Sequence, residues 1–323
     1  MLERWKSDFE NLLNQNSDQV IVSNDNINEN SYDATIINET ITREEIAKAV
    51  EHAKLRKACG IDEIPAEVLK NPTAVELLYI ICNGCFELGK VPDQWTSGII
   101  NPIFKPGSDD KKDPLNFRGI TLISVPSKIY CNILNTRLNS RLDEHKLLCD
   151  EQNGFREKHS CEEHIRTLHT VINDRKNARQ STFVSFIDMR KDFDTVPRNM
   201  LSYKLIKTGM HRKFLSALQS LCDNVKCAVK VNDFLTPWLK VDTGIRKGCL
   251  LFPSLFAIYI NDLTERINPL GCGIQIDDIQ LSILLYADDI AVIAPDESKL
   301  QLMLNVKRGC RMVPRLDTPK QSY

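Results

Sequence analysis

The sequence lacks a surplus of either charge, a long apolar run and a regular cysteine framework. Its 323 residues carry 42 Lys and Arg against 43 Asp and Glu, a formal net charge of −1. Proteins that bind a phosphate backbone usually carry a basic surplus, so any basic surface here must be local. No apolar run approaches the roughly 20 residues that span a bilayer, which argues against insertion into a membrane.

The eleven cysteines are odd in number and follow no framework spacing, and the charged start Met1-Leu-Glu-Arg does not resemble a signal peptide. They predict reduced thiols in an intracellular protein of the nucleus or cytoplasm that is not secreted. Cys82 and Cys85 have metal-ligand spacing, but without a second pair they are better explained as core cysteines of a helix. His164 and His169 miss the spacing of a zinc-binding helix and are expected on a solvated helix face.

Hydrophobic periodicity predicts an α+β protein. Helices are expected over residues 1–16, 42–55, 127–145, 162–179 and 253–267, with others starting near Pro65, Pro72, Arg198 and His211. Thr42 and Glu45 form the capping box of one of them. Strands are expected over residues 98–104, 182–187, 227–231, 238–241, 281–287 and 290–293. The segment from Pro106 to Gly119 is expected to be a polar loop, and residues 17–40 a linker.

Two adjacent carboxylates, Asp288 and Asp289, separate two apolar β-runs and predict an acidic hairpin tip. A solvated turn would explain this pair alone equally well, since Asp is common in turns. A third carboxylate, Asp188, ends another apolar run that could lie beside the hairpin in one sheet. Three converging carboxylates suit Mg²⁺, and two such ions can clamp the attacking and leaving oxygens of a phosphoryl transfer.

Several ordered motifs carry a resemblance to a known family. Phe186-Ile-Asp-Met-Arg-Lys-Asp-Phe-Asp194 and Tyr286-Ala-Asp-Asp289 resemble the first catalytic motif and the polymerase signature of reverse transcriptases from non-LTR (LINE-type) retrotransposons, of an RTE-like or Jockey-like kind. Further segments that are similar to this family are residues 54–67, 100–107, 116–124, 152–156 and 244–262. The likeness spans about residues 44–306.

The resemblance implies an RNA-directed DNA polymerase that adds dNTPs to a primer 3′-OH by two-metal nucleotidyl transfer. Its partners would be an RNA template and a DNA primer, and the oligomeric state stays open. The implied fold is the fingers and palm of a right-hand polymerase, with an antiparallel palm sheet packed on helices and the thumb absent. The expected divisions are residues 1–40 (helix and linker), 41–97 (helical extension), 98–181 (fingers), 182–312 (palm) and 313–323 (truncated tail).

The resemblance also assigns roles to individual residues. Asp188 and Asp288 would hold two Mg²⁺ ions, with Asp289 in support and Mn²⁺ as a possible substitute. The positions expected to bind the nucleotide are Lys105, Arg118, Phe193, Lys247 and Gly248. Phe193 matches the steric gate that rejects a ribose 2′-hydroxyl, and Lys105 and Arg118 match positions that reach the triphosphate. Without the motifs, Phe193 would be assigned to the core and the two basic residues to the solvated surface.

The sequence also departs from the family pattern. Lys247 stands where the family usually has Gln, Asp192 replaces a small residue beside Phe193, and Leu250-Leu-Phe252 replaces a Pro-Leu-Ser segment. With neither a thumb nor an endonuclease, the chain is expected to be a fragment or a decayed copy. The alternative function is therefore a catalytically inactive remnant that at most binds nucleic acid. A different palm polymerase is a third possibility, against which Phe193 and the Arg118-Gly119 motif both argue.

Overall fold

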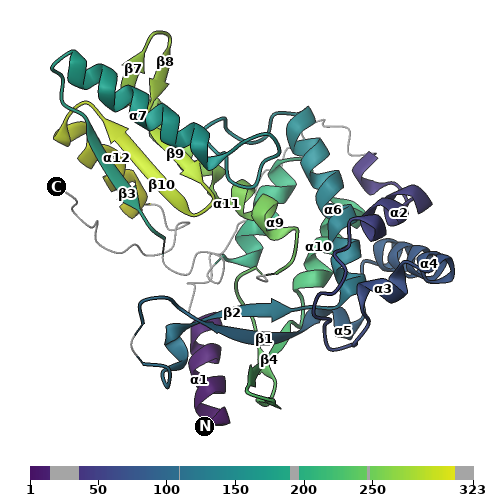
Figure 1. The fold of residues 1–323 in the computed structure, drawn as a ribbon. Coiled ribbons are helices and arrows are strands. Elements are labelled where there is room, and N and C mark those ends of the chain that lie inside the picture. Colours follow the sequence, from purple (N-terminus) through teal and green to yellow (C-terminus); the bar gives the residue numbers. More distant parts are fainter. Residues whose placement is uncertain (15–35, 109, 190–195, 246–247, 310–323) are drawn as a thin grey trace. The chain divides into compact units, whose positions relative to one another are not determined.

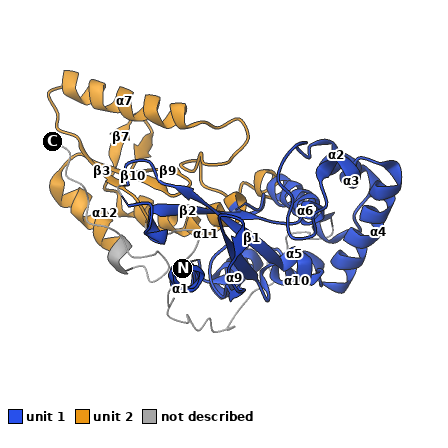
Figure 2. Ribbon diagram, turned by 60° about the horizontal axis from the view of Figure 1, so that its bottom comes forward, with its two compact units in different colours: residues 1–141, 193–252 blue, residues 142–192, 253–323 orange. Residues whose placement is uncertain are grey.

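The computed structural model describes residues 1–14, 36–108, 110–189, 196–245 and 248–309, and over these ranges the protein is a mixed α+β structure. The chain divides into two compact units, each built from two separate stretches (Figure 2). Unit 1 contains residues 1–141 and 193–252, and unit 2 contains residues 142–192 and 253–323. The predicted division into fingers and palm is a different one and stays a prediction.

Unit 1 contains a mixed sheet in the order β2-β1-β4-β5, with β6 also paired to β4. Its strands are β1 (Ser97–Phe104), β2 (Phe117–Leu122), β4 (Lys226–Val231), β5 (Phe234–Leu235) and β6 (Leu239–Lys240). β1 pairs antiparallel with β2 and parallel with β4, so residues far apart in sequence are neighbours. Helix α1 (Leu2–Leu13) buries Trp5 and Phe9 against this sheet, because the two side chains lie four residues apart on one helix face.

The remaining helices of unit 1 pack mainly against one another (Figure 1). They are α2 (Arg43–Glu51), α3 (Ala66–Leu69), α4 (Pro72–Leu88), α5 (Asp93–Thr96), α9 (Arg198–Lys207) and α10 (Arg212–Cys222), with the 3₁₀ turns η1 (Ile36–Asn38) and η2 (Pro114–Asn116). Helix α6 (Val125–Glu144) runs past the boundary at residue 141. The predicted capping box is confirmed, since Thr42 Oγ1 accepts from Glu45 N and Glu45 Oε2 accepts from Thr42 N.

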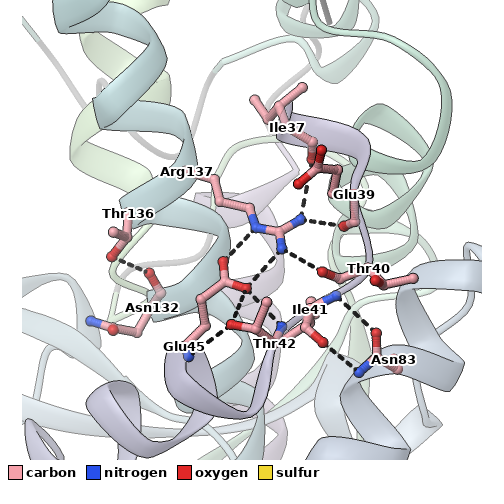
Figure 3. A network of polar contacts seen from close by, with 10 residues as sticks. All are labelled: Ile37, Glu39, Thr40, Ile41, Thr42, Glu45, Asn83, Asn132, Thr136 and Arg137. Atoms are coloured by element: carbon pink, nitrogen blue, oxygen red, sulfur yellow. Dashed lines mark hydrogen bonds and ion pairs between the residues drawn. The ribbon is translucent and has the colours of Figure 1, made fainter. Parts of the chain in front are cut away.

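A largely buried guanidinium, that of Arg137, links the segment before α2 to α6 (Figure 3). Arg137 donates to both carboxylate oxygens of Glu45, at 2.6 and 2.8 Å, and to the backbone oxygens of Glu39 and Thr40. Burial alone would raise the pKa of Glu45, but the hydrogen bonds from Arg137 and Thr42 outweigh it and the pKa is lowered. Glu45 therefore stays ionised as the counter-charge of Arg137.

Unit 2 contains an antiparallel three-stranded sheet in the order β3-β10-β9. Its strands are β3 (Phe183–Ile187), β9 (Ile283–Tyr286) and β10 (Asp289–Ala294), and a separate hairpin is formed by β7 (Ile274–Ile276) and β8 (Ile279–Leu281). Helices α7 (Cys161–Asn177) and α12 (Glu297–Gly309) lie on opposite faces of the sheet (Figures 1 and 2), and α11 (Phe252–Ile267) and η3 (Asn268–Leu270) precede β7. Ala291 and Ile293 face α7, where they pack with Val171.

Most predicted elements are present, and the structure differs in three details from what was predicted. Phe117–Gly119 is the start of β2 rather than the end of a loop, because it pairs with Pro102–Phe104 of β1. The β7–β8 hairpin was not predicted. Pro72 occupies the first turn of α4 as expected, whereas Pro65 is only the N-cap of the short α3. No helix in the described ranges has the length and apolar character to cross a membrane.

Candidate active site

The acidic hairpin is formed by β9 and β10, and its two-residue turn lies one residue earlier in the chain than predicted. Tyr286 pairs with Asp289, so the two loop residues are Ala287 and Asp288 and not the two aspartates. Asp289 is thus the first residue of β10. Ala287 has φ +57° and is buried. Positive φ at the first loop residue is the geometry of tight two-residue hairpin turns, but in an L-residue with a Cβ it costs roughly 1–2 kcal/mol.

The third carboxylate comes from the strand next to β10. Ile187 pairs with Ile290 in antiparallel register, so Asp188, the next residue, follows β3 at the sheet end that carries the turn. Burial raises the pKa of Asp289, and the neighbouring charges of Asp288 and Asp188 raise it further. Asp289 therefore lies close enough to both Asp288 and Asp188 for their charges to interact.

The arrangement of these side chains is acidic but is not a finished coordination shell. Across the parts of the chain that the structure describes, no group of three or more His, Cys, Asp or Glu side chains is arranged to hold a metal ion. The donor chemistry nevertheless fits a divalent cation of the magnesium class, because carboxylate oxygens are its preferred protein ligands. A cation bound here would relieve the repulsion that raises the pKa of Asp289.

Replacing Asp289 by Asn is expected to raise the midpoint of thermal unfolding slightly in EDTA at neutral pH, because it removes one of three interacting negative charges. A matched control is Asp278→Asn in the β7–β8 loop, where Asp277 and Asp278 form another adjacent pair at a hairpin tip. Mg²⁺ should narrow the difference in unfolding midpoint between wild type and Asp289→Asn. A lower midpoint for Asp289→Asn in EDTA would contradict the repulsion.

The loop of residues 151–154 packs against the acidic turn, a contact that the sequence did not predict. Gln152 Oε1 accepts hydrogen bonds from the backbone N–H groups of Gly154 at 2.8 Å and of Ala287 at 3.0 Å. Asn153 N donates to Leu285 O, and Leu285 N donates to Glu151 O. His164 Nε2 lies 3.0 Å from both Glu151 O and Leu285 O. The prediction that His164 sits on a solvated helix face is therefore wrong, whereas His169 is exposed as expected.

The predicted triphosphate-contacting residues lie in unit 1, on or just beyond β1 and β2. Lys105 follows β1, and its Nζ donates to Leu115 O at 2.7 Å. Arg118 lies in β2, where it pairs with Ile103 of β1, and its side chain is exposed. Their expected approach to the carboxylates of unit 2 stays a prediction.

Gly248 is required by local geometry. Its φ is +102°, and an added Cβ would stand 2.7 Å from the backbone oxygen of Thr121, so both conformation and space favour glycine. A contact with a nucleotide is a separate expectation. Phe193 and Lys247, together with Asp192, lie outside the described residues.

The other sequence features have simpler explanations in the structure. Cys82 and Cys85 are buried in α4, as predicted, and burial raises the pKa of the Cys85 thiol to about 11. Thiols with raised pKa values are poor nucleophiles and poor metal ligands at neutral pH. Phe155 has φ +61° and an exposed ring, so it is not a core residue.

The family model described as reverse transcriptase (RNA-dependent DNA polymerase) matches residues 109–310. Among similar curated proteins, "Probable RNA-directed DNA polymerase from transposon BS" of Drosophila melanogaster is 30% identical over 253 residues, which cover 77% of this chain and 27% of that protein. "Probable RNA-directed DNA polymerase from transposon X-element" of the same species is 27% identical over 254 residues, with coverages of 77% and 26%.

A third relative, "Putative 115 kDa protein in type-1 retrotransposable element R1DM" of Drosophila melanogaster, is 24% identical over 281 residues. These residues cover 85% of this chain and 25% of that protein. The chain thus spans about a quarter of the length of the curated relatives described here.

Proposed function

We propose that the chain carries the nucleotidyl-transfer centre of a reverse transcriptase. It belongs to the reverse transcriptase family, which includes the RNA-dependent DNA polymerases of non-LTR retrotransposons. The observation that carries the proposal is the turn Ala287-Asp288 and its neighbour Asp289, set in register beside the end of β3 and Asp188. Three carboxylates that meet at one sheet end repel one another, and a bound cation would relieve that repulsion.

The proposed reaction extends a DNA primer on an RNA template. The primer 3′-oxygen forms a bond to the α-phosphorus of a dNTP, the bond to the pyrophosphate leaving group breaks, and the hydroxyl proton passes to solvent. When bound, two Mg²⁺ ions would supply the charge that stabilises the attacking and leaving oxygens. In this chain Asp188 and Asp288 would hold the ions, with Asp289 in support and with Mn²⁺ able to substitute.

The two sheets are compatible with the palm and fingers of such an enzyme. The β3-β10-β9 sheet with α7 and α12 would be part of the palm, and the β1–β2 hairpin part of the fingers. From the fingers, Lys105 and Arg118 would contact the triphosphate, since paired cations stabilise phosphoryl oxygens. Gly248 and Lys247 would lie beside the incoming nucleotide, and Phe193 would exclude a ribose 2′-hydroxyl. The reaction is expected to take place in the nucleus or the cytoplasm.

A primer-extension assay tests the proposal. The full chain should add dNTPs to a DNA primer annealed to an RNA template when Mg²⁺ or Mn²⁺ is present, should add none in EDTA, and should discriminate against NTPs. If no metal condition gives extension, the polymerase proposal fails for this chain. A filter-binding measurement with the same primer-template then distinguishes a remnant that binds nucleic acid from one that does not.

A further inference from the structure

The turn that carries Asp288 does not hold its shape through the hairpin alone. Ala287 adopts a left-handed conformation and is buried, although it is not glycine. A residue in this sparsely populated region persists only where its surroundings fix it. In this chain the surroundings are the segment 151–154 and the start of α7, all within unit 2.

The direct contact is made by the amide of Gln152, whose side chain is almost fully buried, with 1% exposed. Its oxygen accepts from two backbone N–H groups, those of Gly154 at 2.8 Å and Ala287 at 3.0 Å. Because both donors are backbone amides, the atom that receives them must be the oxygen. The Ala287 N–H belongs to the peptide that enters the two-residue turn, so this bond fixes the backbone immediately before the residue that carries the Asp288 carboxylate.

The other end of the same amide is unsatisfied. Gln152 Nε2 is buried and has no hydrogen-bond partner among the described residues. A buried donor left without an acceptor costs stability. Other buried polar atoms, such as Ser282 Oγ, share this property, so what distinguishes Gln152 is the pair of bonds to its oxygen.

Close backbone packing adds to this contact. An added Cβ on Gly154 would lie 2.1 Å from Ala287 N, so only glycine lets the loop approach the turn this closely. Residue 152 also forms a parallel β-bridge with Leu285.

One step behind this contact, His164 has its Nε2 within 3.0 Å of the carbonyl oxygens of Glu151 and Leu285. Since both neighbours are acceptors, Nε2 carries the proton and donates to them. Asn153 Nδ2, at 3.4 Å, is then placed to donate to His164 Nδ1 and so fixes the tautomer. The imidazole thus ties the 151–154 segment to strand β9, two residues before Ala287.

We propose that Gln152 is a positioning residue for the acidic turn: by accepting the Ala287 N–H it holds the left-handed turn in the one conformation that directs Asp288 toward its cation. This inference rests on the proposed function for its consequence, but the hydrogen bond can be measured without any reaction. Groups that orient metal ligands typically change metal affinity or activity about 10- to 100-fold when they are replaced.

The test compares Gln152→Met, which keeps the length and loses the acceptor, with Gln152→Glu, which keeps an acceptor oxygen. Thr264→Val is the matched control, because Thr264 is also buried in unit 2 and its hydroxyl accepts a bond from Cys149 in the segment leading to Gln152. Two quantities are measured on the full chain: hydrogen exchange of the Ala287 amide by NMR, without metal or substrate, and kcat for primer extension across a Mg²⁺ titration.

Gln152→Met should accelerate exchange of the Ala287 amide, lower kcat about 10- to 100-fold and raise the Mg²⁺ concentration needed for half-maximal rate. Gln152→Glu should keep Ala287 exchange, kcat and the Mg²⁺ requirement closer to the wild-type values than Gln152→Met does. Thr264→Val should leave Ala287 exchange unchanged. If Gln152→Met does not fold, Gln152→Asn, whose shorter amide cannot reach both N–H groups, replaces it in the comparison.

Unchanged Ala287 exchange in Gln152→Met overturns the inference, and so does faster exchange with unaltered kcat and Mg²⁺ dependence. A lower kcat that Gln152→Glu and Thr264→Val share equally also overturns it, because general destabilisation would then explain the loss. If the wild type extends no primer, the proposed function fails, while the exchange data still decide whether Gln152 holds the turn.

Discussion

Replacing Asp288 by Asn is expected to bring Mg²⁺-dependent nucleotide addition to background, a loss of more than about 100-fold. The estimate follows because a direct ligand should matter more than the groups that orient it, whose replacement costs about 10- to 100-fold. Asn keeps the size and one oxygen of the side chain but removes the negative charge that a divalent cation requires. Primer extension at saturating Mg²⁺, with thermal unfolding measured on the same preparations, checks this result.

The chain offers a close control for Asp288→Asn. Asp277 and Asp278 form the two-residue loop between β7 and β8, so unit 2 contains a second pair of adjacent aspartates at a hairpin turn. Of these two hairpins, only β9–β10 pairs with β3, the strand that Asp188 follows. Asp278→Asn should therefore retain full activity. Equal losses in both variants would mean that general acidity, and not this site, supports the reaction.

The acidic hairpin could be predicted because its signal is local. Two apolar β-runs with a two-residue gap leave few alternatives to a tight turn. The register could not be predicted, since the same letters allow the loop to be Ala287-Asp288 or Asp288-Asp289. Side-chain burial decides between them, because a shift of one residue turns every side chain to the other face of the sheet.

What the sequence could not reveal are contacts between distant residues. Phe117–Gly119 follows a polar stretch and has a strand partner only because β1 precedes it in antiparallel register. Gln152 carries no local pattern that would relate it to a turn 135 residues later. His164 was assigned by helical spacing alone, which cannot show that a carbonyl of β9 lies within reach of its ring.

Replacing Arg137 by Met is expected to destabilise the protein by about 3 kcal/mol, at the lower end for a broken buried ion pair. The Arg137 side chain is 10% exposed, whereas Glu45 is 28% exposed and remains partly hydrated when its partner is lost. The variant would also leave the carbonyl oxygens of Glu39 and Thr40 without their donor (Figure 3). Urea unfolding at neutral pH measures the difference.

At acid pH, the difference in unfolding free energy between wild type and Arg137→Met should be smaller. The pKa of Glu45 in the folded protein is below its ordinary value of 4.5, so its contribution is complete above that value and is lost as pH falls through the lowered pKa. Arg43→Met is the control, since Arg43 pairs with Glu76 at 2.7 Å but both side chains are at least half exposed. It should cost far less than Arg137→Met. An equal cost would show that burial does not strengthen the Arg137 pair.

The interleaved order of the two units has a consequence for synthesis on the ribosome. Strand β1 is made early, but its parallel neighbour β4 emerges more than a hundred residues later, and β3 likewise waits for β10. Neither unit can close its sheet until the stretch belonging to the other has been passed. We expect the sheet of unit 1 to be completed after residue 240 and the sheet of unit 2 only after residue 294. Shortened versions of the chain that stop before residue 294 would leave an open strand edge and tend to aggregate.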